Sequence, residues 1–389
     1  MRHGWPYRRS RLAGKLCLLL WLGQADAVGQ TRLQHTDLPP LPALHGKPNP
    51  GVAGAFAGVS HGVLLVAGGA NFPSGYPWQG GAKVWHATVY ALIKRGNSYD
   101  WQTVQPLGRP LAYGASVVWK NQLIGVGGND AKRRYPDVFT LTWDPVAGRL
   151  LTDSLPDLPV ALANLAAAVA GDTLYAFGGE SDRGTERSLY ALSLLDPASG
   201  WQKRADLPGP ARAFTALVAG STGRELGLYV LGGRQTVAGV TTVYADAYEY
   251  RIGQNRWYPL PPMPLPLSAH GAVAGPDQTL LLFGGDDGSQ LKRIEAIINQ
   301  IATMKDGTKK AAVTARRDAL QKGHPGFSRR VWQYQIRQRK WSLLGTLPYP
   351  APVTTPVVRW STGFILPSGE VAPGVRTPAI RRIEPVTRL

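Results

Sequence analysis

The chain has 389 residues and carries a formal charge of +18 at neutral pH. Charged residues make up 17% of it, and Gly (46) and Pro (32) are frequent, a turn-rich balance that favours many short strands over long helices. This length usually means two or three domains, although one closed β architecture can absorb it when it is built from repeats. The basic charge suits nucleic acid, an anionic envelope surface or a small acidic substrate as a partner.

The N-terminal segment predicts an export signal. A basic stretch at residues 8–15 precedes the apolar run 16–22, and the small-residue pattern Ala25-Asp26-Ala27 follows. We therefore expect a signal peptide over residues 1–27 and a mature chain, residues 28–389, in the periplasm. Two adjacent arginines in the basic stretch keep a twin-arginine signal as an alternative.

Further exclusions follow if this signal is removed. Cys17 is the only cysteine and lies within the apolar run, so the mature chain has neither a disulfide nor a thiolate nucleophile. No later segment reaches the roughly 20 apolar residues that a transmembrane helix needs. The mature chain stays strongly basic, and nucleic acid is its least expected partner after export, which leaves anionic surfaces or an acidic small molecule.

Five diglycines divide the chain into units of kelch-repeat length. Successive pairs lie 51–59 residues apart, and each ends a short apolar run that is typical of a buried strand. The pairs are Gly68-Gly69, Gly127-Gly128, Gly178-Gly179, Gly232-Gly233 and Gly284-Gly285. A sixth unit ends at residues 365–369, where Ser368 replaces one glycine. Downstream strands carry Tyr or Phe, often with a following Trp, whose rings suit the space between wedge-shaped blades. These features predict an all-β fold, a six-bladed kelch-type β-propeller over residues 28–389.

The pattern changes to helical spacing between the fifth and sixth units. Apolar residues recur at three- and four-residue intervals over residues 288–323, on both sides of the turn Lys305-Asp306-Gly307. We expect a helical hairpin inserted into the propeller at 288–323. It is either a decorative insertion or a cap over one mouth of the ring.

The two ends of the chain are expected to share one blade. A propeller leaves an unpaired strand edge unless its termini meet. The segment Pro378–Val386 supplies about one outer strand and then stops, and Arg32–Leu38 has no other obvious partner. We predict that these two segments pair and close the ring.

Three stretches of the chain carry a resemblance to a known family. They are Gly51–Gly58 (GVAGAFAG), Ala112–Ser116 (AYGAS) and Gly369–Thr377 (GEVAPGVRT), of which the last is the most specific. With them the chain resembles the bacterial N-acetylneuraminate epimerases, or sialic acid mutarotases, which are six-bladed kelch propellers. In the best-known members the third stretch precedes the first, so the chain resembles a circularly permuted branch. Permuting a closed ring moves its termini without moving its site.

The resemblance implies the chemistry of the third stretch. Mutarotation removes the proton of the anomeric hydroxyl and protonates the ring oxygen, after which the open ketone recloses on its other face. The family assigns Glu370 as the base and Arg376 as the cation that pairs with the sialate carboxylate, which suits the planar fork of arginine. The turn dipeptide Pro373-Gly374 can fold both side chains back to one mouth.

The innermost strands should place further side chains around the central channel. Counting back about 15 positions from the diglycines reaches Tyr113, Asn164, His270 and Thr354, with Arg212 nearby once the longer loop of its blade is allowed for. Asn71, just after the first diglycine, is a further candidate for the same mouth. We treat these residues as candidates for substrate contacts or for the proton donor, with a structural role as the alternative for each.

Other functions of propellers find little support in the sequence. A copper site of the galactose-oxidase kind needs a Tyr–Cys crosslink, and no His/Glu cluster has zinc-ligand spacing, so we expect neither a metal nor a cofactor. Two alternatives stay open. One is a non-catalytic kelch module that binds a glycan or an envelope protein, and the other is an epimerase of another acidic sugar. Glu370 separates the non-catalytic module from an epimerase, because a binding module needs no base. The oligomeric state also stays open.

Overall fold

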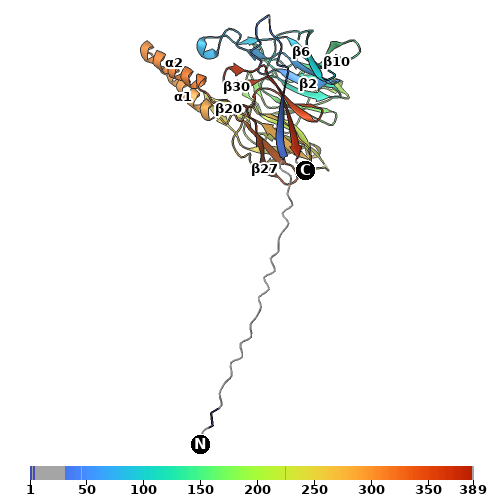
Figure 1. The fold of residues 1–389 in the computed structure, drawn as a ribbon, viewed down its shortest axis with the longest axis vertical. Coiled ribbons are helices and arrows are strands. Elements are labelled where there is room, and N and C mark those ends of the chain that lie inside the picture. The colour runs from blue at the N-terminus through green and yellow to red at the C-terminus, as the bar shows by residue number, and fades with distance from the viewer. Residues whose placement is uncertain (2, 5–30, 45, 224, 388–389) are drawn as a thin grey trace.

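The computed structural model describes residues 1, 3–4, 31–44, 46–223 and 225–387. The expected signal peptide, residues 1–27, lies outside this part of the chain except for Met1, His3 and Gly4. Figure 1 shows a body of β-strands with one pair of helices at its side. Neither helix is long and apolar enough to cross a bilayer.

Six four-stranded antiparallel sheets form the blades of a β-propeller, as the diglycine repeat predicts. From the axis outward, blade 1 consists of β2 (Phe56–Ser60), β3 (Val63–Ala67), β6 (Val89–Arg95) and β7 (Ser98–Val104), and blade 2 of β8 (Ala115–Trp119), β9 (Gln122–Val126), β10 (Val138–Asp144) and β11 (Arg149–Leu155). Blade 3 contains β12 (Ala166–Ala170), β13 (Thr173–Phe177), β16 (Leu189–Ser193) and β17 (Gln202–Lys203), and blade 4 contains β18 (Ala216–Ser221), β19 (Leu226–Leu231), β22 (Ala247–Arg251) and β23 (Arg256–Leu260). Blade 5 contains β24 (Gly271–Ala274), β25 (Thr279–Phe283), β26 (Arg330–Gln335) and β27 (Lys340–Thr346), and blade 6 contains β28 (Val358–Trp360), β29 (Gly363–Pro367), β32 (Ile380–Thr387) and β1 (Thr31–Leu38).

Short hairpins decorate the second-to-third strand connections of four blades. They are β4 (Ala70–Asn71) with β5 (Val84–Trp85), β14 (Glu180–Ser181) with β15 (Gly184–Thr185), β20 (Arg234–Val237) with β21 (Val240–Val243), and β30 (Glu370–Ala372) with β31 (Val375–Arg376). Short 3-10 turns complete the described elements: η1 (Pro77–Gln79), η2 (Pro197–Ser199) and η3 (Ile252–Gln254). Each hairpin begins directly after a diglycine or its Ser368-Gly369 counterpart, so these loops share one end of the ring.

The termini close the ring inside blade 6. Strand β1 pairs antiparallel with β32 over its whole length, from Thr31 opposite Thr387 to Leu38 opposite Ile380. The two strands, blue and red in Figure 1, lie side by side. The predicted pairing of the N-terminal and C-terminal segments is therefore confirmed, with the N-terminal strand on the outer edge.

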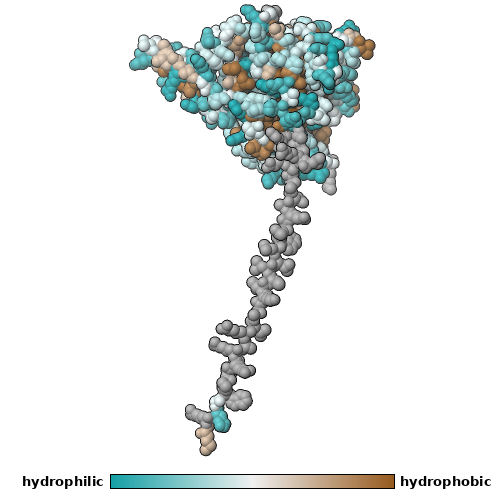
Figure 2. Space-filling view, in the orientation of Figure 1, coloured by the Kyte–Doolittle hydropathy of each residue, from teal (hydrophilic) through white to brown (hydrophobic). Residues whose placement is uncertain are grey.

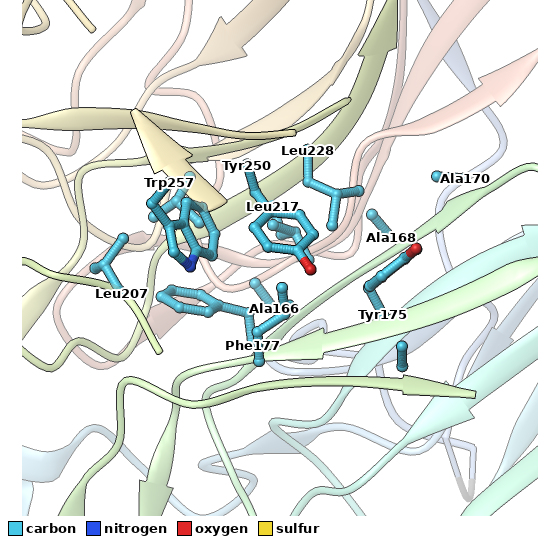
Figure 3. Close-up of a cluster of buried hydrophobic side chains, with 13 residues drawn as sticks. Ala166, Ala168, Ala170, Tyr175, Phe177, Leu207, Leu217, Leu228, Tyr250 and Trp257 are labelled. Atoms are coloured by element: carbon cyan, nitrogen blue, oxygen red, sulfur yellow. The ribbon is translucent and has the colours of Figure 1, made fainter. Parts of the chain in front are cut away.

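Large side chains fill the wedges between neighbouring blades. Figure 3 shows one such cluster, in which Phe177 of blade 3 meets Trp257 of blade 4 with ring centroids 5.6 Å apart. The Trp257 indole N–H also donates to the carbonyl of Ala205, which belongs to the segment that leaves blade 3. Equivalent bonds tie other blades to their predecessors, from Trp101 to Pro39, Trp201 to Pro156 and Trp341 to Pro261. The repeated tryptophans thus fill space and also join successive blades.

The predicted hairpin at 288–323 consists of α1 (Ser289–Thr303) and α2 (Gly307–Lys322), inserted between β25 and β26. Asp306 caps α2 by accepting hydrogen bonds from the backbone of Thr308 and Lys309. Glu295 of α1 accepts the backbone N–H of Thr241 in β21, and α2 contacts η1 of blade 1. Figure 1 shows the hairpin projecting from the rim beside β20 and β30.

Candidate active site

A closed circle of backbone hydrogen bonds surrounds the propeller axis. Each blade contributes one residue just before its innermost strand, and all six have positive φ angles between 51° and 69°. They are Gly54, Tyr113, Asn164, Phe214, Ala269 and Thr354. Each donates its N–H to the carbonyl of the equivalent residue in the preceding blade, with N···O distances of 2.6–3.1 Å, and Gly54 closes the circle on Thr354. Five of the six are not glycine, so the ring holds backbone strain of the kind often found at functional sites.

A second set of six residues, the tier, lies next to this ring of backbone hydrogen bonds. The residue after each diglycine forms a β-bridge with the residue before each ring position. The six tier residues are Ala70, Asn129, Glu180, Arg234, Asp286 and Glu370, so five of them are polar or charged. Tier and ring side chains touch: the Asn164 amide donates to Glu180 (2.8 Å), and the Arg234 guanidinium lies 3.9 Å from the centroid of the Phe214 ring.

The diglycines make this arrangement possible by allowing close backbone approach. A side chain at Gly127 would place its Cβ 2.4 Å from the carbonyl oxygen of Leu162 in the next blade, and its φ of 63° is already unfavourable for other residues. Ser368 tolerates the same conformation, with φ 64°, in blade 6. Its hydroxyl hydrogen-bonds the backbone of Val52 and Thr377, which ties the last blade to the first.

Glu370 and Arg376 form an ion pair in the β30–β31 hairpin. The Arg376 Nη1 lies 2.8 Å from Glu370 Oε1, which also accepts the Gly374 N–H at 2.6 Å. The turn at Pro373-Gly374 therefore brings the two side chains together, as the sequence predicts. Arg376 Nη2 donates to the Tyr113 hydroxyl at 3.3 Å, which connects the pair to the ring. Glu370 Oε2 has no hydrogen-bond partner among the described residues.

The other sequence candidates take different places around the axis. Tyr113, Asn164 and Thr354 are ring residues, and His270 follows the ring residue Ala269. His270 is buried, and neither ring nitrogen has a hydrogen-bond partner among the described residues. Burial lowers the pKa of His270 to about 4, so the imidazole is neutral at physiological pH.

Two candidates use their side chains within the fold. Arg212 is fully buried, forms a bidentate ion pair with Asp246 (2.6 and 2.9 Å) and reaches the carbonyl of Gly232. Asn71 is also fully buried, where its amide donates to Gly51 and its oxygen lies 2.8 Å from His86 Nε2. Neither side chain is open to a ligand at the mouth, so we leave both out of the site.

Sequence reasoning missed most of the tier. Glu370 is the first residue after Ser368-Gly369, and the same position after the other diglycines holds Asn129, Glu180, Arg234 and Asp286. That shared position was readable from the repeat alone. Burial raises the pKa of Asp286, opposed by the Gly288 N–H and by Arg234, whereas burial lowers the pKa of Arg234 against nearby carboxylates.

The segment after the helical hairpin places one more side chain, His324, near Glu370. His324 follows α2, and its Nδ1 accepts the Gly326 N–H at 3.0 Å, which leaves the proton of the neutral ring on Nε2. Burial lowers the pKa of His324, and Asp286, Asp287 and Glu370 oppose this effect. The insertion thus contributes at least one side chain near Glu370.

Beneath the ring, a cavity of about 170 Å³ follows the axis along the innermost strands. Small side chains such as Ser116, Ala167 and Ala216 line it. Within the described ranges, no three His, Cys, Asp or Glu side chains converge in a way that could hold a metal ion. On the face in Figure 2, hydrophobic side chains are scattered in small areas rather than gathered in one patch.

Comparison with known proteins places this geometry in context. A family model described as N-acetylneuraminate epimerase matches residues 23–148 and 155–386. The chain is 29% identical to the N-acetylneuraminate epimerase of Brucella melitensis biotype 1 over 257 residues, which is 65% of this chain and 64% of that protein. It is 40% identical to the protein of that name from Yersinia enterocolitica over 118 residues, or 28% of this chain and 29% of the relative. The chain thus spans less than two thirds of these relatives.

A solved structure supports the fold independently. The structure titled "Structure of YjhT" aligns with a TM-score of 0.59 at 14% sequence identity and covers 87% of this chain and 95% of that one. At this identity the likeness concerns the fold alone, and the fold of this chain is the predicted six-bladed propeller.

Proposed function

Because the chain belongs to the N-acetylneuraminate epimerase family, we propose that it interconverts the α and β anomers of N-acetylneuraminate. The N-terminal export pattern supports a periplasmic location as part of this proposal. The similarity covers only part of the curated relatives, so the activity has to rest on the residues of the site as well.

The proposal depends on the hydrogen bonding of the Glu370 carboxylate, which uses only one of its two oxygens within the described residues. Its Oε1 is fixed by Arg376 and by the Gly374 N–H, whereas Oε2 has no partner among the described residues. A carboxylate held in this way is oriented, yet keeps one oxygen free to accept a proton from a ligand. A module that only binds a glycan gains nothing from such a base, so the arrangement favours catalysis.

The residues then divide the reaction between them. Glu370 Oε2 takes the proton of the anomeric hydroxyl, and the bond between the anomeric carbon and the ring oxygen breaks. The ring oxygen receives a proton, which gives the open-chain ketone. Rotation about the adjacent carbon–carbon bond and reversal of the proton transfers close the ring on the other face. One base and one proton donor suffice, and they exchange roles in the closing step.

Tyr113 is our candidate for the proton donor. Its hydroxyl oxygen accepts a hydrogen bond from Arg376 Nη2, so its own proton stays available for donation. Arg376 connects Tyr113 to Glu370, with one amino group on each. In this scheme Arg376 is a positioning residue that sets the distance between the base and the donor.

The direct test is the fate of freshly released α-N-acetylneuraminate followed by NMR. With micromolar protein we expect the α-anomer signals to decay to the equilibrium mixture faster than in buffer, with a rate that rises with protein concentration. A decay identical to that of the buffer sample would contradict the proposed activity and favour a binding role.

A further inference from the structure

We propose that Arg234 of β20 is the residue that binds the carboxylate of the acidic sugar, an inference that rests on the proposed function and names its specificity determinant. It replaces the expectation that Arg376 makes this contact. Arg376 and Arg234 are the two arginines considered for this contact, since Arg134 beside Asn129 is paired with Asp182, and the sugar carries one carboxylate. The carboxylate should therefore bind the guanidinium whose N–H groups are not already used by other side chains.

Arg376 has its donors committed or closed off. Its side chain is 4% exposed, with Nη1 on Glu370 and Nη2 on the Tyr113 hydroxyl. Its Nε is buried and reaches no acceptor among the described residues, and Phe72 covers the guanidinium at 4.9 Å. A bidentate contact with a carboxylate would have to displace Glu370, the proposed base, or Tyr113, the proposed donor.

Arg234 is in the opposite situation. It occupies the tier position that Glu370 occupies in blade 6, and its guanidinium carbon lies over the aromatic ring of Phe214, 3.9 Å from the ring centroid. No hydrogen bond or ion pair of this guanidinium exists among the described residues, whereas the backbone of Arg234 exchanges two hydrogen bonds with Ala213. The contact with Phe214 holds the guanidinium in place, and its N–H groups have no acceptor among the described residues, so they can donate to the two oxygens of a ligand carboxylate.

The acidic side chains around Arg234 do not hydrogen-bond its guanidinium. Glu180 accepts from Asn164, Asp286 accepts from the Gly288 N–H, and Glu370 is paired with Arg376. Carboxylate oxygens that remain free can accept from the hydroxyls and the amide of a sugar, whereas the sugar carboxylate needs a donor. Arg234 is thus the cation on the tier that complements the single acidic group of the ligand.

Lys83 is the competing cation at this mouth. Its Nζ lies 4.9 Å from the centroid of Tyr113 and 5.3 Å from that of Trp85, and its side chain is exposed. A solvated ammonium ion on a long stem gives a weaker and less directional contact than a guanidinium held against an aromatic ring. The experiment therefore includes Lys83→Gln as a comparison in the same mouth.

The test measures binding of two ligands, N-acetylneuraminate and its neutral methyl ester, to the full chain. For Arg234→Gln we expect affinity for the acid to fall about 10- to 100-fold, as for loss of a charge-assisted contact, with little change for the ester. Arg234→Lys should recover part of the loss. Arg256→Gln makes the same change on an exposed arginine of β23 in the same blade and should alter neither affinity.

Several outcomes would overturn the inference. Equal losses for acid and ester would mean that Arg234 shapes the site without recognising charge, and an unchanged affinity for the acid would exclude it outright. If Lys83→Gln instead lost the preference for the acid over the methyl ester, the contact would belong to Lys83. If Arg234→Gln fails to fold, Arg234→Met, which keeps the apolar contact with Phe214, gives the same readout.

This test is separable from that of the proposed function. Binding of the acid that depends on Arg234, without acceleration of anomer exchange by the wild type, would keep the carboxylate contact and reject the epimerase. Normal exchange with an unchanged KM in Arg234→Gln would keep the epimerase and reject the contact.

Discussion

At the scale of single residues, polar side chains near the axis divide into those that the fold uses and those that it leaves with free groups. Arg212 and Asn71 belong to the first kind, since every strong donor or acceptor they carry meets a partner inside the protein. Glu370 Oε2 and the Arg234 guanidinium belong to the second. Unused hydrogen-bonding capacity at a half-buried position is costly unless a ligand supplies the partner, so these groups define the site better than residue type does.

His270 yields a prediction about acid stability. Burial lowers its pKa from the ordinary 6.5 to about 4 in the folded chain, so between these pH values the unfolded state binds more protons. Stability from this residue is fully present above pH 6.5 and is lost as the pH falls through 4, by about 3 kcal/mol in all.

The matched variant is His270→Thr, because Thr215 and Thr355 hold the equivalent place in blades 4 and 6, where their hydroxyls donate to backbone carbonyls. Denaturant unfolding between pH 4 and pH 7 should show a smaller pH dependence for the variant. Parallel curves for both proteins would mean that His270 takes up its proton in the folded state.

The reach of sequence reasoning also shows at this scale. Counting back from the diglycines found the ring residues Tyr113, Asn164 and Thr354, because the turn between the two innermost strands is short in their blades. It reached His270 instead of Ala269, because that turn is longer in blade 5. In blade 4 the allowance made for the longer loop was too large and reached Arg212 instead of Phe214. A constant offset cannot follow turns of variable length, and burial of a charged pair such as Arg212–Asp246 leaves no local pattern.

At the scale of elements, the sequence repeat was sufficient to predict the blades. The positive φ angles at these crossings favour glycine, so the five diglycines with Ser368-Gly369 predicted the six blades. The closing strands followed from the need to pair the open edge of the ring. The period change at 288–323 likewise gave the helical hairpin. The contacts of that hairpin could not be read in advance, because they depend on a rim segment far away in the sequence, β21.

Two deletions should separate elements that hold the ring from elements that sit on it. Removing residues 380–389 takes away β32, which leaves β1 without a partner and exposes one edge of β29, so we expect a large fall in Tm or no folding. Replacing residues 289–322 by a short Gly/Ser linker should change Tm by only a few degrees, because α2 buries no residue and α1 buries only Ile294 and Ile297.

Thermal unfolding of the two deletion proteins beside the full chain checks this contrast. Equal unfolding temperatures for the full chain and the 380–389 deletion would contradict the closure of the ring by β32. Collapse of the hairpin deletion would show that the insertion is part of the core.

At the scale of the whole molecule, the ring converts six equivalent positions into one asymmetric site. Backbone hydrogen bonds hold the six ring residues in equivalent positions. The side chains of the tier differ from blade to blade, from the small Ala70 to the charged Arg234 and Glu370. Stability and specificity are thereby assigned to different atoms, so the tier can change its chemistry without loss of the fold. This is why the sequence repeat predicts the architecture while the function depends on the positions at which the repeat is broken.

The central claim is that Glu370 at this mouth catalyses anomer exchange. Two-dimensional exchange NMR of N-acetylneuraminate at equilibrium, with wild type and with Glu370→Gln at equal concentration, tests it most directly. The account predicts exchange between α and β signals that grows with wild-type protein, and a rate about 10²–10⁴ lower for a Glu370→Gln protein that keeps the wild-type Tm and still binds the sugar. Equal exchange rates for the two proteins would contradict it.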